Sequence, residues 1–174
     1  MRFRRAPAPV PDEAFHVDRT GGLTPGMTLG TRFIGEIGPL SRHGERYVLG
    51  TPGPSPFISH AIENFWELFR ATNHPEKLSR FAVVFAWETY DDAHQFCTDY
   101  DPGDIWAVTG RSHPQAFRAD MNLLRAGTFI DMTMRAEQYW TGQASDNPQW
   151  EWLLPAPVTV VRPATAPDNE EPAI

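Results

Sequence analysis

The sequence predicts a single domain of the α+β class, and three features support this prediction. The 174 residues are 41% hydrophobic and 21% charged, which is the length and composition of one globular domain with a sizeable core. Short strand patterns and helical patterns follow one another without the regular alternation of a parallel α/β fold. An apolar, β-branched run at residues 153–161 predicts buried strands near the end of the chain.

The two ends of the chain differ in composition from this domain. Residues 1–13 are basic and then rich in Pro and Ala, so we expect a loose arm there. Residues 163–174 are mostly Pro, Ala and acidic residues, which is typical of a disordered tail. The single domain is therefore expected at residues 14–162.

Bulk charge and cysteine content exclude several classes of function. The formal net charge of -7 argues against a protein that coats nucleic acid or lies on an anionic membrane. Cys97 is the only cysteine, so no intramolecular disulfide can form. The start of the chain lacks the apolar segment of a signal peptide, and no run has the length of a membrane-spanning helix. We expect a cytoplasmic protein with no membrane partner, or a toxin delivered by another route.

Hydrophobic periodicity predicts the elements in order. Strands are expected at residues 14–19, 28–37, 79–87, 104–109 and 153–161. Helices are expected at residues 56–70, 90–96, 116–126 and 133–140, the first of them capped by Ser59. Residues 38–56 contain many Gly and Pro and have no period, so we expect a long loop there. Pro155 and Pro157 cannot donate to a strand ladder, so the last strand segment should bend, bulge or lie at an edge.

One acidic residue is distinguished by its neighbours. Glu151 lies between Trp150 and Trp152, immediately before the apolar run. A carboxylate between two large aromatic rings is costly to desolvate unless another group bonds to it. Two interpretations follow from these residues alone: a solvated acid at the start of a strand, or a perturbed acid in a functional site.

Three segments, in this order along the chain, resemble the ADP-ribosyltransferase superfamily. Residues 15–20 (FHVDRT), followed by LTPG at residues 23–26, resemble the first-strand histidine segment of rifampicin-modifying transferases and poly-ADP-ribose polymerases. Residues 83–87 (VVFAW), with DDA at residues 91–93, are similar to the strand-then-helix segment of the polymerases. Residues 149–155 (QWEWLLP) resemble the strand of the catalytic glutamate, including the Q-x-E form of one subgroup.

The resemblance implies a split, strongly curved antiparallel sheet with flanking helices, and NAD in the cleft between its halves. It implies that His16 holds a ribose hydroxyl of NAD and that Glu151 bonds the 2′-hydroxyl of the nicotinamide ribose. The sugar carbon becomes positive as nicotinamide leaves, so a fixed anion in a dry cleft stabilises the transition state. Gln149, one strand period before Glu151, would position the acceptor. The implied activity is transfer of ADP-ribose from NAD to a nucleobase, a protein side chain or a small molecule.

The chain departs from the family pattern at the ring that stacks on nicotinamide. Val84 occupies the position that best matches this tyrosine, and it has no ring. Phe85, Trp87 or Tyr90 would then stack instead. In the other subclass of these transferases a serine stands at the start of this strand, where Ser79 lies. The alternative for Ser79 is a turn cap.

Three further residues would contact NAD by the same resemblance. Asp18 stands where a threonine or serine is common. Arg19 and Arg80 are expected to contact the pyrophosphate, because a guanidinium matches phosphate bidentately. The alternative for Arg80 is a surface ion pair. We assign no residue to a metal.

Other functions stay open on the sequence. One is a non-catalytic module on the same fold that binds a nucleotide or a protein partner. The absence of an aromatic ring at Val84 suggests this alternative. Another is a related enzyme that uses NAD to remove an RNA 2′-phosphate. A third is a small α+β protein without a link to NAD, in which His16 and Glu151 would lie far apart.

Overall fold

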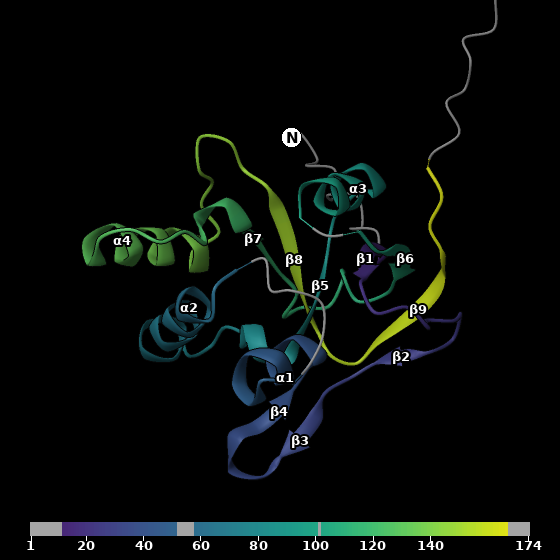
Figure 1. Cartoon of the computed structure of the whole chain (residues 1–174), viewed down its shortest axis with the longest axis horizontal. Coiled ribbons are helices and arrows are strands. Elements are labelled where there is room, and N and C mark those ends of the chain that lie inside the picture. Colours follow the sequence, from purple (N-terminus) through teal and green to yellow (C-terminus); the bar gives the residue numbers. More distant parts are fainter. Residues whose placement is uncertain (1–11, 52–57, 101, 167–174) are drawn as a thin grey trace, which may run out of the picture.

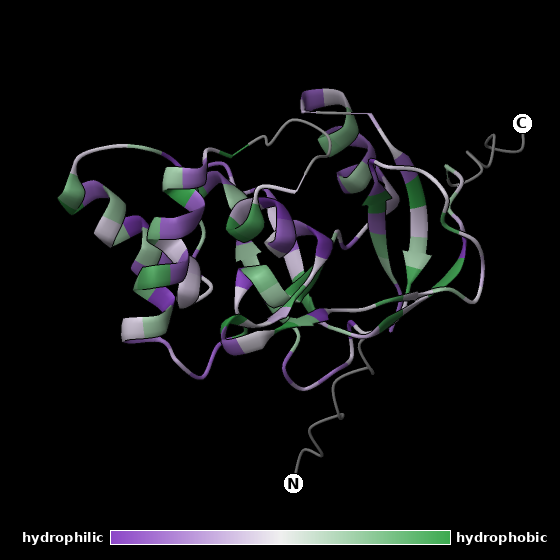
Figure 2. Cartoon of the chain, turned by 60° about the horizontal axis from the view of Figure 1, so that its bottom comes forward, coloured by the Kyte–Doolittle hydropathy of each residue, from purple (hydrophilic) through white to green (hydrophobic). Residues whose placement is uncertain are grey.

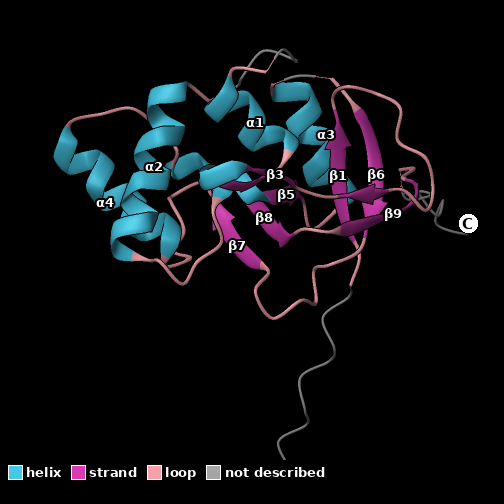
Figure 3. Cartoon of the chain, turned by 90° about the horizontal axis from the view of Figure 1, so that it is seen from below, coloured by secondary structure: helices cyan, strands magenta, loops and turns pink. Residues whose placement is uncertain are grey.

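The computed structural model describes residues 12–51, 58–100 and 102–166. Within this part of the chain, the protein is a mixed α+β structure with four α-helices and a strongly curled, antiparallel sheet that forms half a barrel (Figures 1 and 3). The α+β class predicted from the sequence is therefore confirmed. Most of the predicted arm, most of the predicted tail and the start of the predicted helix at residues 56–70 lie outside the described residues.

Two antiparallel groups of strands build the curled sheet. The first has the order β1-β6-β9-β2, with bounds Ala14–Asp18 (β1), Thr28–Leu29 (β2), Asp104–Val108 (β6) and Val158–Pro163 (β9). The second has the order β5-β8-β7, with bounds Val83–Ala86 (β5), Phe117–Asp120 (β7) and Trp150–Pro155 (β8). Phe15 of β1 and Trp87, just after β5, exchange backbone hydrogen bonds of 2.9 and 2.8 Å, which join the two groups. A separate hairpin contains β3 (Arg32–Ile34) and β4 (Gly38–Leu40).

Each α-helix begins at a side chain that accepts a hydrogen bond from the first turn, where backbone N–H groups lack helical partners. The caps are Ser41 for α1 (Arg42–Leu49), Ser59 for α2 (His60–Asn73), Thr89 for α3 (Tyr90–Asp99) and Thr128 for α4 (Phe129–Trp140). Three short 3₁₀ turns complete the elements: η1 (Gly35–Ile37), η2 (Arg80–Ala82) and η3 (Met121–Leu123). In Figures 1 and 3, α2 and α4 lie together at one end of the molecule, and β1, β6 and β9 lie at the other.

Two clusters of buried apolar side chains hold these elements together. The larger joins the β5-β8-β7 strands to the helices and includes Trp66 of α2, Trp140 of α4 and Leu153 of β8. The smaller joins strands of both groups and includes Val108 of β6 and Leu154 of β8. Successive residues of β8 thus face different clusters, which explains why this strand is apolar on both faces. The helices alternate between hydrophobic and hydrophilic residues, as packing on one side requires (Figure 2).

Most predicted elements agree with the structure within a few residues. The expected strands at residues 14–19 and 104–109 correspond to β1 and β6, and the expected helices at residues 56–70, 90–96 and 133–140 correspond to α2, α3 and α4. Ser59 caps α2 as predicted, by accepting a hydrogen bond from the backbone N–H of Ile62. The chain bends between β8 and β9, in the segment of Pro155 and Pro157, as the missing donors required.

Two predicted elements are wrong. Residues 116–126, expected to be a helix, form β7 and η3, because pairing with β8 outweighs the local helix propensity of Ala, Arg, Met and Leu. Residues 38–56, expected to be a loop, contain β4 and α1. In both segments, tertiary contacts rather than local preference decide the backbone.

Three further segments differ in their limits. The expected strand at residues 79–87 begins with η2, and only its second half forms a strand, β5. The expected strand at residues 28–37 is divided into β2 and β3. At the end of the domain, β9 continues to Pro163, one residue into the predicted tail.

Candidate functional site

A cavity of about 220 Å³ lies between β1, β5, α1 and the start of β8. Its charged and imidazole-bearing lining comes from widely separated parts of the chain: His16, Asp18, Arg19, Arg42, His43, Arg46 and Glu151. The cavity therefore brings together the two residues on which the sequence interpretation depends, the histidine of the first strand and the glutamate of β8.

His16 lies on β1, and its ring is held against β5. Its Nδ1 lies 2.8 Å from the backbone oxygen of Phe85. A carbonyl oxygen only accepts hydrogen bonds, so Nδ1 carries the ring proton and the lone pair is on Nε2. Burial lowers the pKa of His16, and the bond to Phe85 and the charge of Asp18 offset this effect only in part. A neutral imidazole therefore offers one acceptor nitrogen to a molecule in the cavity.

Asp18, two residues further along β1, has a carboxylate oxygen without a donor. Its Oδ1 accepts hydrogen bonds from the backbone N–H (3.0 Å) and the hydroxyl (2.8 Å) of Thr20. Its Oδ2 is buried and receives no hydrogen bond within the described part of the chain. Burial raises the pKa of Asp18, but the bonds from Thr20 and the nearby N–H of Leu23 lower it by more. An unpaired buried acceptor costs about 1–3 kcal/mol, which a ligand O–H or N–H would recover.

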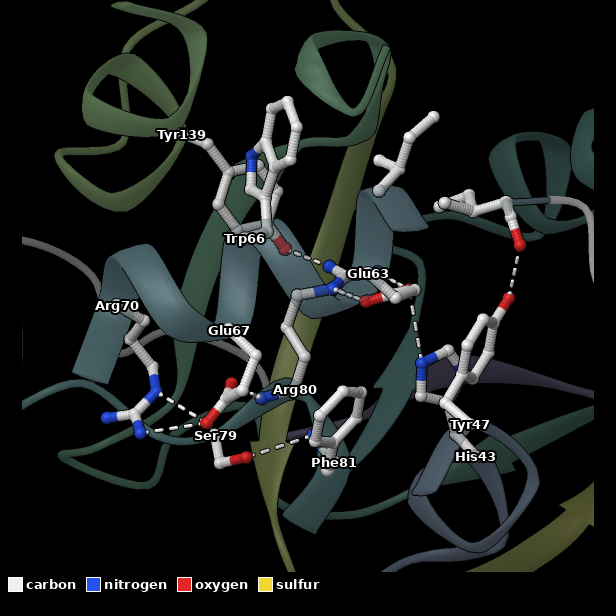
Figure 4. Close-up of polar contacts among 12 residues, drawn as sticks. His43, Tyr47, Glu63, Trp66, Glu67, Arg70, Ser79, Arg80, Phe81 and Tyr139 are labelled. Atoms are coloured by element: carbon white, nitrogen blue, oxygen red, sulfur yellow. Dashed lines mark hydrogen bonds and ion pairs between the residues drawn. The ribbon is translucent and has the colours of Figure 1, made fainter. Parts of the chain in front are cut away.

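Glu151 lies on β8, which pairs with β5, and is only 2% exposed. Its Oε1 accepts hydrogen bonds from Nη1 of Arg80 (2.6 Å) and from the hydroxyl of Tyr139 (2.7 Å). Arg80 is fully buried and also pairs with both carboxylate oxygens of Glu63, through Nε and Nη2, each at 2.8 Å (Figure 4). We call Glu63, Arg80, Tyr139 and Glu151 the buried ion network. It uses Oε1 of Glu151 and leaves Oε2 without a hydrogen bond among the described residues.

The charges of this network depend on one another. Burial raises the pKa of Glu63, but Arg80 and then His43 lower it to well below its ordinary value. Burial opposes the charge of Arg80, yet Glu151 and Glu63 hold the pKa of Arg80 well above its ordinary value. Burial also raises the pKa of Tyr139, so its hydroxyl remains a neutral donor. With both acids ionised, the network has one more negative than positive charge, and a cationic group in the cavity would be stabilised by this excess.

The structure places Arg80 and Ser79 away from the cavity lining. Every nitrogen of the Arg80 guanidinium contacts Glu63, Glu151 or Tyr139, so we no longer assign Arg80 to the pyrophosphate. Its ion pairs are buried, not at the surface as the alternative interpretation expected. The Ser79 hydroxyl accepts a hydrogen bond from a backbone N–H of η2 at 3.1 Å, which agrees with a turn cap.

Gln149 and Tyr90 also lie outside the cavity lining. Gln149 precedes β8, and its side-chain oxygen accepts a hydrogen bond from the hydroxyl of Tyr100 at 3.3 Å. The backbone N–H of Gln149 donates to Asp120 at 2.8 Å. Tyr90 is the first residue of α3, and its ring packs edge-on against Phe15.

Of the rings considered for nicotinamide stacking, Phe85 and Trp87 line the cavity, as does Val84. The Trp87 ring is 4% exposed and packs on another aromatic ring of α3. Phe85 is half-buried, with the guanidinium carbon of Arg80 4.6 Å from its centroid and the ring of His43 at 4.7 Å. Phe85 is therefore the more accessible ring.

Three cavity residues were missed by the sequence analysis because they lie on α1, in the segment expected to be a loop: Arg42, His43 and Arg46. A signal for this helix was present in its two ends. Ser41 accepts a hydrogen bond from the first turn, and Gly50 ends the helix in the left-handed conformation, with φ of 67°. Because α1 is short and contains Gly44, its residues do not show a clear helical periodicity.

Gly44 explains how α1 reaches the site. The backbone N–H and the hydroxyl of Ser41 donate to the carbonyl of Phe81 at 2.8 and 3.1 Å. A Cβ at position 44 would lie 2.0 Å from this same oxygen, so only glycine permits the contact between α1 and η2. The contact brings His43 next to Glu63, with Nε2 of the imidazole 3.2 Å from Oε1 of the carboxylate.

One family model matches most of the chain. Its description is "Protein of unknown function (DUF2441)", and the match covers residues 46–168. The chain belongs to the DUF2441 family. The region of this DUF2441 protein that matches contains the whole buried ion network but not His16. No curated protein matches the sequence. No helix in the described ranges combines the length and the apolar character needed to cross a membrane.

Proposed function

We propose that the protein is an NAD-dependent ADP-ribosyltransferase, which breaks the bond between nicotinamide and ribose and transfers ADP-ribose to an acceptor. The acceptor would be a nucleobase, a protein side chain or a small molecule. The observation that carries the proposal is that His16, on the first strand, and Glu151, on β8, line the same cavity. The second segment of the resemblance, residues 83–87, contributes Phe85 to the same lining.

Glu151 is suited to stabilise positive charge on the ribose. Arg80 and Tyr139 both bond to Oε1, so Oε2 is the oxygen available to a sugar hydroxyl. These bonds fix the carboxylate before the substrate arrives. The ribose carbon becomes cationic as nicotinamide leaves with the bonding electron pair, and a preorganised anion in a site with little water stabilises this charge more strongly than bulk water does.

The β1 wall and α1 supply groups for the rest of NAD. His16 and Asp18 lie on one face of β1 and would accept hydrogen bonds from ribose hydroxyls, through Nε2 and Oδ2. Arg19, Arg42 and Arg46 line the cavity and match the charge and shape of a diphosphate. We assign these three arginines to the role that the resemblance gave in part to Arg80.

The size of the cavity limits which part of NAD it would enclose. Its volume of about 220 Å³ is below the range of about 300–1,000 Å³ for most small-molecule sites. The nicotinamide and its ribose would therefore occupy the interior, with Phe85 as the stacking ring. The adenosine end would extend past the mouth of the cavity.

Release of nicotinamide tests the proposal directly. The full-length protein is incubated with NAD, free nicotinamide is measured over time, and labelled NAD with a cell lysate identifies the acceptor. Glu151→Gln keeps the side-chain volume and an oxygen for Arg80 and Tyr139 but removes the negative charge. We expect it to slow nicotinamide release by about 10²–10³-fold, the usual effect of losing one preorganised electrostatic group.

The matched control is Glu76→Gln, because Glu76 is exposed and does not line the cavity. It should release nicotinamide at the wild-type rate. A Glu151→Gln protein with native circular dichroism and undiminished activity would remove Glu151 from the reaction. If the wild-type protein neither binds NAD nor releases nicotinamide, the proposed function is wrong.

A second candidate function is a nucleotide-binding module without turnover. The burial of Glu151 favours it, because a 2% exposed carboxylate paired with Arg80 and Tyr139 also serves a structural purpose. Val84, at the position of the stacking tyrosine, points in the same direction. Calorimetry that detects NAD binding, with no nicotinamide released over a long incubation, would establish this alternative.

A further inference from the structure

The pair formed by His43 and Glu63 has no part in the proposal above, although it borders the same cavity. Nε2 of His43 lies 3.2 Å from Oε1 of Glu63, a close contact that is not aligned as a hydrogen bond. Glu63 is fully buried, whereas the His43 side chain is 14% exposed and lines the cavity. Figure 4 shows the imidazole approaching Glu63 from one side and Arg80 from the other.

Two aromatic rings hold the imidazole of His43. The ring centroids of Tyr47 and Phe85 lie 4.6 and 4.7 Å from its own. Tyr47 is anchored in turn, because its hydroxyl donates to the backbone oxygen of Ile58 at 2.8 Å. Burial and then the charge of Glu63 raise the pKa of Tyr47 to about 12, so this hydroxyl stays a neutral donor. The imidazole is therefore packed between rings, and a small rotation would complete a hydrogen bond to Glu63.

Glu63 determines which nitrogen of His43 carries the proton. The pKa of Glu63 lies well below its ordinary value, because Arg80 and then His43 outweigh the effect of burial. An ionised carboxylate only accepts hydrogen bonds, so the adjacent Nε2 carries the proton and Nδ1 has the lone pair. No residue within the described ranges forms a hydrogen bond with Nδ1. An imidazole with one nitrogen against a buried carboxylate and a lone pair on the other is arranged as a general base.

We propose that His43 is the general base of the transfer reaction, an inference that rests on the proposed function. The nucleophilic atom of the acceptor forms a bond to C1′ of the ribose, while the bond from C1′ to nicotinamide breaks and leaves its electron pair on the nicotinamide nitrogen. The acceptor proton passes to Nδ1 of His43 and then to solvent. Nicotinamide departs neutral, and Glu63 keeps its charge throughout.

The buried ion network connects this base to the anion that stabilises the ribose. Glu63 bonds to Arg80, and Arg80 bonds to Glu151, so one guanidinium links the two acids. Among charged and titratable groups, Glu63 of α2 and Tyr47 of α1 contact His43. The others line the cavity together with His43: His16, Asp18, Arg19, Arg42, Arg46 and Glu151. Glu63 is the nearest of them by measured contact, and it stabilises the charge that the imidazole acquires on taking the proton.

The first test compares His43→Gln with the wild type, with water as the acceptor so that the natural acceptor is not needed. Nicotinamide release is measured across the pH range in which histidine titrates, and NAD affinity is measured by calorimetry. We expect His43→Gln to slow release by about 10²–10⁴-fold, the usual contribution of a general base. NAD affinity should not change. The rate should fall toward low pH in the wild type, as expected of a reaction that needs an unprotonated base, and this fall should be smaller in His43→Gln.

His60→Gln is the matched control. His60 begins α2 and packs on the same ring of Tyr47, with centroids 4.9 Å apart, but it does not line the cavity. This variant should retain the wild-type rate and pH profile. If His60→Gln lost as much activity as His43→Gln, the loss would come from altered packing of Tyr47. That result would overturn the role of His43.

A second test requires neither substrate nor turnover. Ring ¹⁵N chemical shifts of the ligand-free wild type at a pH of about 8, where an ordinary imidazole is neutral, should show the proton of His43 on Nε2. A proton on Nδ1 would overturn the inference. Full activity of His43→Gln with an unchanged pH profile would overturn it while leaving the proposed function intact. A wild type without NAD binding and without nicotinamide release would overturn both.

Discussion

The cavity is lined by polar residues of β1 (His16 and Asp18) and of β8 (Glu151), which we call the β1 wall and the β8 wall. The two walls differ in how their buried polar groups are hydrogen-bonded. On the β1 wall, Oδ2 of Asp18 is buried and receives no hydrogen bond from a described residue, and Nδ1 of His16 is hydrogen-bonded to the backbone of β5. On the β8 wall, Oε1 of Glu151 accepts hydrogen bonds from Arg80 and Tyr139, and Oε2 is left for a ligand. The carboxylate of the β8 wall is therefore held by a buried cation, whereas the hydrogen bonds to Asp18 on the β1 wall come from neutral groups of Thr20. Variants on the β8 wall should lower stability, and variants on the β1 wall should lower affinity.

The largest effect is expected from Arg80→Met. This change removes the only cation of the buried ion network and leaves two buried acids, Glu63 and Glu151, without the guanidinium that pairs with both of them. Breaking a buried ion pair in this way lowers the free energy of unfolding by about 3–5 kcal/mol, measured by denaturant titration. Arg118→Met is the control, because Arg118 is 42% exposed and its ion pair is worth about 0–1 kcal/mol. Equal stability of the two variants would show that the network does not hold the β8 wall.

Acid should weaken the network and the β1 wall in different pH ranges. Arg80 and His43 lower the folded-state pKa of Glu63 despite its burial, so the unfolded chain takes up this proton first. Glu63 therefore contributes stability that is present above a pH of about 4.3 and is lost as the pH falls further. Burial lowers the pKa of His16, so the unfolded chain also takes up that proton first, and stability is lost below a pH of about 6.5.

We therefore expect the free energy of unfolding to fall in two stages between pH values of about 7 and 3. His16→Gln should remove the upper stage and leave the lower one. A flat profile over this range would contradict the charge assignments on both walls.

A smaller effect is expected from Tyr139→Phe. This variant keeps the ring against Trp140 but removes the hydroxyl that donates to Oε1 of Glu151. Losing a hydrogen bond to a charged group costs about 1.5–3 kcal/mol of stability. Nicotinamide release should also slow, with unchanged NAD affinity, because Glu151 becomes less well fixed. Unchanged thermal stability would mean that Arg80 alone positions Glu151.

The smallest effect is expected on the β1 wall, from Asp18→Asn. The amide keeps an oxygen for the two donors of Thr20 but removes the negative charge, which these donors stabilise at Oδ1 and which has no donor at Oδ2. Stability should fall only slightly, because the pKa of Asp18 is lowered in the folded protein and the charge is therefore favoured there. NAD affinity should fall roughly tenfold, which corresponds to about 1.4 kcal/mol. A loss of stability with unchanged affinity would reverse the contrast between the walls.

Local patterns in the sequence were sufficient for β1 and for the strands near the end of the chain, but not for α1. Alternation predicted a strand at β1, with His16 on the face opposite Phe15. The two prolines in the apolar run left a bend, a bulge or an edge open, and the structure has a bend between β8 and β9. The sequence left open whether Glu151 is a solvated acid or a perturbed one, and the structure shows a buried carboxylate bonded by Arg80 and Tyr139.

The identity of those partners could not be derived from the sequence. Arg80, Glu63 and Tyr139 lie far from Glu151 along the chain and meet only through the packing of α2, η2 and α4 against β8. The same limit applies to β7, whose residues have helix-forming side chains but pair with β8. It also applies to His43, because its place in the cavity depends on a backbone contact rather than on a local pattern.

That backbone contact has a consequence for engineering the cavity. Since the carbonyl of Phe81 occupies the space where a side chain at position 44 would begin, no rotamer can absorb a larger residue there. Gly44→Ala would force α1 and η2 apart and would therefore displace Arg42 and His43, which line the cavity. The shape of the cavity thus depends on a residue that does not line it, and attempts to admit bulkier molecules should start from this position.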